Sequence, residues 1–562
     1  MASTYMTPGV YIEEKNAFPN SAVAVETAVP VFIGYTETAE FNSNSLLNQP
    51  VRITSFAEYM ERFGGGFKAK YTVAKVPSAA DVTAITDADQ KAAAQAIQKN
   101  AGLMKENTIV TNGATWYISV AKDNELYMYN SIRMFYANGG ANCYILSVGT
   151  YGGEDSLTIS ASDFLGSEDN PITPFDLLKK ESEPTLVIVP DAIALGAAAY
   201  NTIYTTVLQH CSDMQSRFAI LDLKQQVSTD STDAVVEEFR DAIGVNSLNY
   251  GAAYYPWLKA AVVQPNEVDL DNIDLGAVNL ADFLPEAIAQ KVIDKFNTDT
   301  KKSAADLAAA QAELTAAETA KDDAAAAAAT QQIADLQTQP DKIRASYLQS
   351  LKAVSPTYNA VLDKIRTKMN ELPPSGAMAG LYTMVDNSRG VWKAPANVSV
   401  SMVNAPSVNI SSEGQQTLNV DVMAGKSINV IRSFPGIGTL VWGGRTLDGN
   451  SQDWRYINVR RTLIMIEQSL KLAARAYVFE PNDANTWITV KSMFDNFLVN
   501  LWKQGALAGA APEQAFDVQI GLGSTMTAND ILDGKMLITV KVAIVRPAEF
   551  IVITFQQQMQ QS

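Results

Sequence analysis

Residues suited to nucleophilic catalysis are few in this chain of 562 residues, which has one histidine, His210, and two cysteines, Cys143 and Cys211. A Ser-His-Asp or Cys-His mechanism would have to use His210 as its base. His210 and Cys211 are neighbours in a stretch predicted to be helical, where adjacent side chains point about 100° apart and do not face each other. A helix histidine with a satisfied hydrogen bond is the simpler interpretation, and a hydrolase is a distant alternative.

Motifs for metals and nucleotides are weak as well. A structural zinc site takes four nitrogen or sulfur ligands, more than His210, Cys143 and Cys211 can supply. The two thiols could pair, but buried free cysteines are more common in a chain with so few. Gly425-Lys426-Ser427 resembles the end of a phosphate-binding loop, but an upstream glycine of that motif is missing, so we predict a turn. We therefore predict no catalytic residue, metal or cofactor.

Charge and hydropathy narrow the classes of partner. The net charge is −17, yet residues 376–562 carry 15 basic and 14 acidic residues, so the acidity belongs to the first two thirds. A protein that neutralises the phosphates of a nucleic acid needs positive charge. Because this chain is acidic, we expect no nucleic-acid partner. No stretch of about 18 apolar residues and no secretory signal are present. We predict a soluble protein of a reducing compartment, with roughly three or four domains and no direct membrane insertion.

Hydrophobic patterns predict a mixed α/β, multidomain protein. Helices expected over 127–136 and 200–214 alternate with strands over 143–148, 186–189 and 218–221, which favours a parallel-sheet α/β middle domain. Helical insertions are predicted over 78–105 and about 269–372. Of these, residues 303–330 hold 15 alanines in 28, which indicates an exposed helical hairpin turning near Lys321. A solvated decoration is the simpler interpretation of the hairpin, and a partner-binding coiled coil is the alternative.

Residues after Pro374 have a different composition. Residues 398–430 are predicted to be β-rich, and two amphipathic helices are expected over 455–477 and 486–502. The first helix places four cations, Arg460, Arg461, Lys471 and Arg475, in one arc apart from its apolar face. The pattern alone leaves open whether this basic stripe is a solvated face or an interface.

Both ends of the chain read as isolated strands. Such segments gain affinity by pairing with the edge of another sheet, although pairing within their own fold is about equally consistent with the pattern. The predicted domains are an amino-terminal arm over 1–24, an outer α/β body over 25–429, an α+β domain over 430–545 and a carboxy-terminal arm over 546–562. The arm residues expected to pair are Val10, Tyr11, Ile12, Phe550, Ile551, Val552, Ile553 and Phe555.

Several motifs, in order along the chain, resemble contractile tail sheath proteins. They are Thr7-Pro8-Gly9-Val10-Tyr11-Ile12-Glu13-Glu14, Val31-Phe32-Ile33-Gly34-Tyr35-Thr36, the stretch 131–145, Pro374-Ser375-Gly376, the stretch 389–397, Gly443-Gly444-Arg445-Thr446-Leu447, the stretch 453–461, and Phe479-Glu480-Pro481-Asn482-Asp483. The Ala-rich insertion resembles nothing in that family.

The resemblance implies a structural role. Sheath subunits polymerise in helical rings around an inner tube, and their arms add strands to the sheets of neighbouring copies. The carboxy-terminal domain faces the tube, which makes the four cations tube-facing candidates, and the middle domain is subtilisin-like in fold without bringing activity. The implied partners are copies of the chain, the inner tube protein, and baseplate and terminal cap proteins.

The implied setting is assembly in the bacterial cytoplasm, as part of a virion tail or of a released contractile particle that drives its tube through a target envelope. A specialised sheath paralogue, such as a terminal or baseplate-proximal ring, is the alternative within this class.

Overall fold

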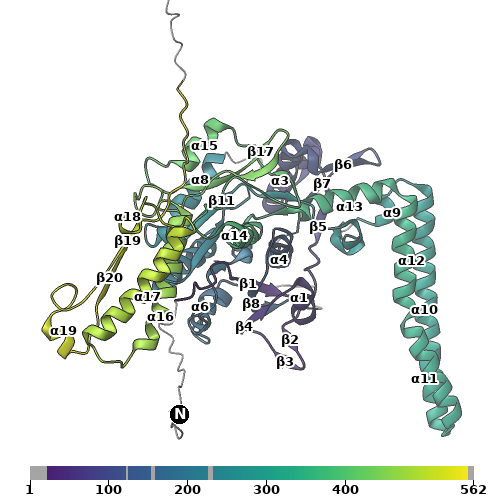
Figure 1. The fold of residues 1–562 in the computed structure, drawn as a ribbon. Helices are drawn as coiled ribbons and strands as arrows, with labels where there is room; N and C mark the ends of the chain where they lie inside the picture. Colours follow the sequence, from purple (N-terminus) through teal and green to yellow (C-terminus); the bar gives the residue numbers. More distant parts are fainter. Residues whose placement is uncertain (1–21, 122–124, 153–158, 226–231, 277, 555–562) are drawn as a thin grey trace, which may run out of the picture.

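The computed structural model describes residues 22–121, 125–152, 159–225, 232–276 and 278–554. At its centre lies a nine-stranded sheet of order β15-β18-β17-β11-β10-β9-β1-β8-β4 (Figure 1). Neighbouring strands from β8 through β17 run parallel, whereas β4 and β18 are antiparallel to their partners. The bounds are β1 (Pro30–Thr36), β4 (Pro50–Ile53), β8 (Cys143–Thr150), β9 (Leu186–Ile188), β10 (Phe218–Asp222), β11 (Gly251–Tyr255), β15 (Val398–Ser399), β17 (Ile428–Phe434) and β18 (Gly438–Val441).

Helices close over the central sheet because its inner strands are apolar on both faces. Every residue of β1, β9, β10 and β11 is buried, as parallel strands covered on two sides require. The covering helices include α4 (Met128–Ala137), α7 (Ala197–Met214) and α14 (Ser375–Arg389). The predicted helices over 127–136 and 200–214 and the three predicted strands are therefore confirmed, as is the α/β class.

Smaller sheets extend this body. One is a four-stranded sheet of order β13-β5-β7-β6, and another has the order β14-β12-β16. The helical excursion predicted over 78–105 is confirmed as α2 (Ala79–Ala84) and α3 (Ala88–Leu103). The strands are β5 (Tyr71–Lys75), β6 (Thr108–Thr111), β7 (Ala114–Val120), β12 (Leu258–Ala260), β13 (Ile273–Asp274), β14 (Glu371–Leu372) and β16 (Val403–Pro406).

A long helical hairpin projects from the body (Figure 1). It consists of α10 (Ala287–Ala320), α11 (Asp323–Gln337) and α12 (Gln339–Val354), and α13 (Pro356–Met369) returns the chain to the body. The turn lies at Lys321, which adopts a φ of 56°, and Asp322 caps α11 by accepting the N–H of Ala325 at 3.0 Å. The hairpin predicted near Lys321 is confirmed.

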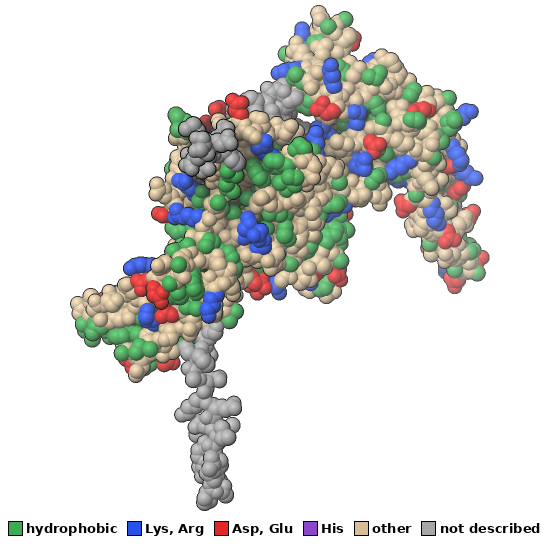
Figure 2. Space-filling view, turned by 45° about the horizontal axis from the view of Figure 1, so that its top comes forward, with side chains coloured by type: hydrophobic (Ala, Val, Ile, Leu, Met, Phe, Trp, Pro, Cys, Tyr) green, Lys and Arg blue, Asp and Glu red, His purple; other side chains and the backbone are tan. Residues whose placement is uncertain are grey.

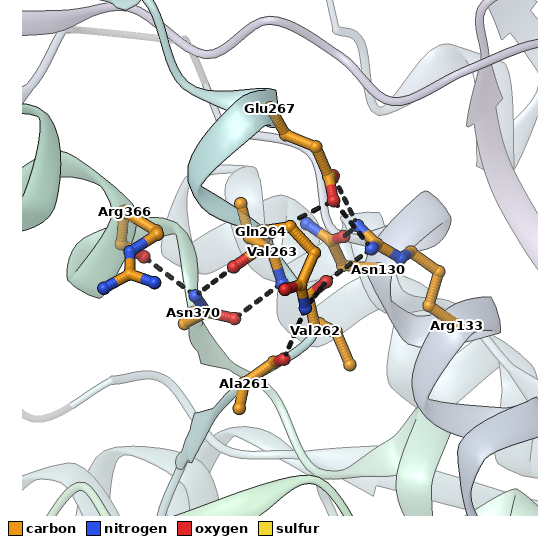
Figure 3. A network of polar contacts seen from close by, with 9 residues as sticks. All are labelled: Asn130, Arg133, Ala261, Val262, Val263, Gln264, Glu267, Arg366 and Asn370. Carbon is orange, nitrogen blue, oxygen red and sulfur yellow. Dashed lines mark hydrogen bonds and ion pairs between the residues drawn. The ribbon is translucent and has the colours of Figure 1, made fainter. Parts of the chain in front are cut away.

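The base of the hairpin is fastened where the chain leaves and re-enters the body (Figure 3). Arg133 of α4 donates two hydrogen bonds to Glu267, at 2.7 and 2.9 Å, and a third to the carbonyl of Val262. The Asn370 amide accepts the N–H of Val263 at 2.9 Å and donates to its carbonyl at 3.1 Å. These bonds hold the two ends of the insertion together and against α4.

A second hydrophobic core lies in the carboxy-terminal third. It forms between α16 (Ile457–Ala474), α17 (Ala484–Lys503) and a two-stranded sheet of β19 (Phe516–Ile520) and β20 (Ile538–Val542). Helix α16 joins the cores, because Ile457 and Ile464 belong to the main core whereas Met465 and Leu470 belong to the second. Both predicted amphipathic helices are confirmed.

Three details of the prediction are corrected. The boundary expected at residue 430 falls inside β17, a strand of the central sheet, so the body extends further than predicted. The stretch 398–430 is not simply β-rich, since it contains α15 (Ser412–Asn419), which Ser411 caps by accepting the N–H of Gly414 at 3.0 Å. The turn predicted at 425–427 lies slightly earlier, over residues 422–424, and Lys426 after it forms an isolated bridge with Asp448. Asp421 accepts the N–H of Lys426 at 3.1 Å.

A buried carboxyl begins α14. Asp222, at the end of β10, accepts the N–H of Ser375 at 2.7 Å and is 1% exposed. Burial disfavours the charged form and raises the pKa of Asp222 to about 7. In the unfolded chain an aspartate has a pKa of about 3.9. The folded protein therefore binds this proton more tightly than the unfolded one does.

Stability should consequently fall as the pH rises from about 4 through about 7, because ionisation of Asp222 is easier in the unfolded chain. Asp222→Asn keeps the acceptor for Ser375 and removes the charge. We expect the free energy of unfolding, measured with urea, to fall between pH 5 and pH 8 by about 2–3 kcal/mol more in the wild-type protein than in the variant. Parallel pH profiles of the two proteins would contradict this assignment.

Candidate assembly interface

The carboxy-terminal segment is clamped to the body at Glu549. Arg445 donates two hydrogen bonds to this carboxylate, from Nε to Oε1 at 2.9 Å and from Nη2 to Oε2 at 2.6 Å. Asn419 donates to it at 2.7 Å and Tyr456 at 3.1 Å. Bidentate arginine–carboxylate pairs fix orientation as well as distance. Glu549 is thus the last firmly held point of the chain in the described residues.

The electrostatics of the clamp favour a charged carboxylate. Partial burial alone would raise the pKa of Glu549, but hydrogen bonds from Arg445 and Asn419 outweigh it, so this pKa lies below its usual value. The Arg445 side chain is 5% exposed and that of Glu549 19%. The low exposure of both side chains shields the ion pair from solvent, which helps to keep its geometry fixed.

Beyond the clamp, the chain runs into solvent as an apolar segment. Phe550, Ile551, Val552 and Ile553 are between 70% and 87% exposed, and they belong to no strand or helix. Phe555 lies outside the described residues. Four consecutive exposed β-formers are an open template for pairing with another chain. Within the described part of the chain this segment pairs with no strand, and its pairing with another copy stays a prediction.

The amino-terminal segment is fastened along α16. Val10, Tyr11 and Ile12 lie outside the described residues, so their role stays a prediction. The backbone N–H of Val25 donates to Ser469 Oγ at 3.1 Å. Thr27 donates to the carboxylate of Asp386 at 2.6 Å. These contacts direct the segment across the join between the two cores.

The buried side chain of Arg461 also holds the amino-terminal segment in place. Its guanidinium donates to Asp386 at 2.6 and 3.0 Å and to the carbonyl of Thr27 at 2.9 Å. Both charged side chains are 3% exposed, and the guanidinium lies 4.6 Å from the centre of the Tyr382 ring. One buried ion pair therefore connects α16, α14 and the amino-terminal segment.

Arg460 is buried as well. Its guanidinium lies between the rings of Tyr250 and Trp454, 4.0 and 4.8 Å from their centres, and burial lowers its pKa. The expected stripe of four cations is therefore wrong as a single surface, because the main body covers the first turns of α16. Lys471 and Arg475, near the other end of α16, are exposed. Their contact with a tube stays a prediction.

The small sheet of the second core has open edges. Strands β19 and β20 pair only with each other within the described residues. Ile538, Val540 and Val542 pack against the second core, whereas Thr539 and Lys541 are exposed. Each strand keeps one edge that pairs with no other strand in the described residues, although Lys491 of α17 donates to the carbonyl of Val518 on β19. The sheet can therefore accept a further strand, most openly along β20.

Exposed apolar side chains gather on the lobe that carries this sheet (Figure 2). Phe479 is fully exposed and has a φ of 72°, Leu532 is 84% exposed and Ile488 65%. An aromatic residue in the left-handed region is strained, and such outliers concentrate at functional sites. This end of the lobe is a second candidate contact surface.

The single histidine has a structural setting. His210 of α7 is buried, and its Nε2 lies 2.6 Å from Nη1 of Arg217. Burial and the neighbouring cation lower the pKa of His210 to about 4. Cys143 and Cys211 are both buried and free, as predicted. The imidazole therefore serves as a buried hydrogen-bond partner of arginine.

Sequence reasoning missed the residues that hold the two segments. Arg445 was noted only within the motif Gly443-Gly444-Arg445-Thr446, and Asp386 and Ser469 were not singled out. A usable signal exists at Glu549, which is an isolated acidic residue directly before an apolar run. Its distant partner could not be read from spacing.

Comparisons with known proteins agree on one class. Residues 450–558 match the family described as "Phage tail sheath C-terminal domain". The tail sheath protein of Vibrio phage KVP40 is 24% identical over 199 residues, 35% of this chain and 28% of that protein. That of Salmonella phage ViI is 30% identical over 150 residues, 27% of this chain and 23% of that protein. The match thus spans about a quarter of these relatives.

Solved structures extend the likeness to the whole chain. The sheath of the extracellular contractile injection system PVC, in its contracted state, is 26% identical with a TM-score of 0.54, over 99% of both chains. The contracted helical sheath of the anti-feeding prophage is 26% identical, also with a TM-score of 0.54, over 99% of this chain and 100% of that one. The chain is related to contractile tail sheath proteins. In the described part of this sheath relative, no helix is long and apolar enough to span a membrane.

Proposed function

We propose that this chain is a structural sheath subunit, which polymerises in helical rings around an inner tube and contracts to drive the tube through a target cell envelope. The observation that carries the proposal is the exposed segment Phe550–Ile553 beyond the Glu549 clamp, in a chain that resembles contracted sheaths from end to end.

The polymer forms by strand donation. The segment after Glu549 leaves one copy and adds to an open edge of β19 or β20 in another, and residues 10–12 act in the same way. Main-chain hydrogen bonds supply affinity in such pairing. Because the donating segment and the accepting sheet are different surfaces, the contact is heterologous and extends into rings or an open helix rather than ending at a two-fold dimer. Hydrogen-bonded arms keep copies connected while their bodies rotate during contraction.

The purified chain alone tests this function. We expect hollow, striated tubes in negative-stain electron microscopy, since arm pairing needs no second protein. A protein that remains monomeric at every concentration and salt condition would contradict the proposed function. Adding the inner tube protein should then yield tubes with a filled lumen.

The domain built on α16 and α17 faces the tube in this proposal, and the acidic body faces outward, where like charges keep particles apart. Lys471 and Arg475, which are exposed on α16, are the remaining charged candidates for the tube contact. The double variant Lys471→Glu/Arg475→Glu is expected to reduce co-sedimentation with tube protein about tenfold while sheath-only tubes still form. Unchanged co-sedimentation would assign the contact elsewhere, for instance to Phe479.

A specialised ring of the same particle is a second candidate. The baseplate of the anti-feeding prophage also provides a match, at 25% identity with a TM-score of 0.52. Abundance separates the two roles, since a main sheath is the dominant band of a purified particle and a baseplate-proximal ring is a minor one. In either role we propose assembly in the bacterial cytoplasm, contacts with baseplate and terminal cap proteins, and no enzymatic activity.

A further inference from the structure

The helical hairpin separates its charges along its length. We call residues 304–337 its outer half, and residues 287–303 with 338–354 its inner half. The outer half has six acidic residues and one basic residue, a net charge of −5. The inner half has seven basic and three acidic residues, a net charge of +4. The outer acidic residues, all exposed, are Asp306, Glu313, Glu318, Asp322, Asp323 and Asp335.

Helix stability does not explain this separation. In α10, acidic residues are absent from the first turn and basic residues from the last turn. Glu318 lies in the last turn, where the helix dipole disfavours it, whereas Glu286 and Lys321 at the two caps have the favoured signs. The dipole therefore gives no reason for the net separation between the two halves.

Internal pairing does not explain it either. In the described residues, no ion pair involves Asp306, Glu313 or Glu318, nor Lys301 or Lys302. In the inner half, Lys295 pairs with Asp299, Arg344 pairs with Asp271 of the body, and Lys352 donates to two body carbonyls. The cations left without an ion pair among the described residues are Lys291, Lys301, Lys302 and Lys342. Figure 2 shows the hairpin standing clear of the body with its charged side chains in solvent. Both signs are therefore available to a partner.

The outer half does not contribute to the main core. Its buried residues, Ala310, Ala317 and Ala329, contact the opposite helix of the hairpin, whereas Ile293 and Tyr347 of the inner half join the main core. With 34 residues, α10 alone is about 51 Å long. Because the base is fastened by Arg133 and Asn370, the hairpin presents its two charged halves at a fixed separation.

We propose that the acidic outer half of one hairpin docks on the basic inner half of a hairpin from a second copy of this chain. The argument is charge complementarity, because one surface carries −5 and the other +4. A basic surface of a different protein could also bind the acidic outer half, but it would leave the basic inner half without a partner. The contact adds a lateral link between copies that is independent of the terminal arms.

Disulfide trapping on the full-length chain tests the contact. Thr319→Cys marks the outer half next to Glu318, and Thr298→Cys marks the inner half next to Lys301; both threonines are exposed. Cys143 and Cys211 are buried and do not compete. In an equal mixture of the two variants at low salt, we expect the mixed disulfide to form at least about tenfold faster than either like-with-like disulfide, and about 0.5 M salt to abolish the difference.

Charge reversal supplies the matched control. Asp306→Lys/Glu313→Lys/Glu318→Lys reverses the outer half, and Lys291→Glu/Lys301→Glu/Lys302→Glu reverses the inner half. Either set alone should slow formation of the mixed disulfide about tenfold. When a copy with a reversed outer half is mixed with a copy with a reversed inner half, the rate should return to within about twofold of that between copies without charge reversal. Neither set should lower the melting temperature much, because all six side chains are exposed and surface substitutions change stability little.

Equal rates for mixed and like-with-like disulfides, or failure of the two reversals to compensate, would overturn the proposal. Tube formation is scored separately by microscopy. A chain that traps mixed disulfides without forming tubes would contradict the sheath function alone, and tubes without trapping would contradict the hairpin contact alone.

Discussion

A chain that ends after Glu549 is expected to fold normally and to form no tubes. The truncation removes Phe550–Ile553, which contact no strand of their own chain, and it keeps the carboxylate that Arg445 and Asn419 hold. Little of the free energy of unfolding should be lost, less than about 1 kcal/mol, because the removed side chains are mostly solvent-exposed. Tube formation should be lost, since the segment after Glu549 can no longer add to a neighbour's sheet, and we expect residues 10–12 and the hairpin contact not to replace it. Sedimentation velocity and negative-stain microscopy measure both outcomes.

A shorter truncation provides the control. Ending the chain after Phe555 removes only its polar, glutamine-rich end and keeps the whole apolar run. This variant should still assemble. Ordered tubes from the chain that ends after Glu549 would show that copies associate without this arm, and a truncated protein that unfolds or aggregates would show that the segment belongs to its own fold.

Strands β8, β9 and β10 of the central sheet were predictable because they are short apolar runs separated by helical patterns. Strands β9 and β10 are buried along their whole length, so their residue types alone indicate a strand. The amphipathic helices over α16 and α17 were predictable for a similar reason. Their apolar faces repeat with the helical period, and both helices form close to the expected bounds.

The role of the cations on α16 was not predictable. A helical wheel shows which residues share a face but not whether another element covers that face. Arg461 is paired with Asp386, which is 75 residues earlier in the chain, and Arg460 makes cation–π contacts with aromatic rings from two other segments. Such partners depend on the tertiary fold. For the same reason the clamp at Glu549, which joins residues 104 apart, left no trace in local spacing.

Asp386→Ala should destabilise the protein more than any other substitution considered for this chain. The Arg461 guanidinium is 3% exposed, and the loss of its carboxylate would leave a buried charge without compensation. Breaking a buried pair from one side costs about 3–5 kcal/mol. Thr27 would lose its acceptor as well, so the amino-terminal segment should become more sensitive to protease. Urea unfolding and limited proteolysis measure the two effects.

Two comparisons identify the cause of this destabilisation. The exposed pair Lys295–Asp299 provides a matched control, and Asp299→Ala should cost less than about 1 kcal/mol. The double variant Asp386→Leu/Arg461→Met removes both charges, and it should be more stable than Asp386→Ala because no buried charge is left unpaired. If the double variant were stable but failed to assemble, the ion pair would serve mainly to aim the amino-terminal arm. Equal losses in Asp386→Ala and Asp299→Ala would instead mean that Arg461 finds water or another acceptor inside the protein.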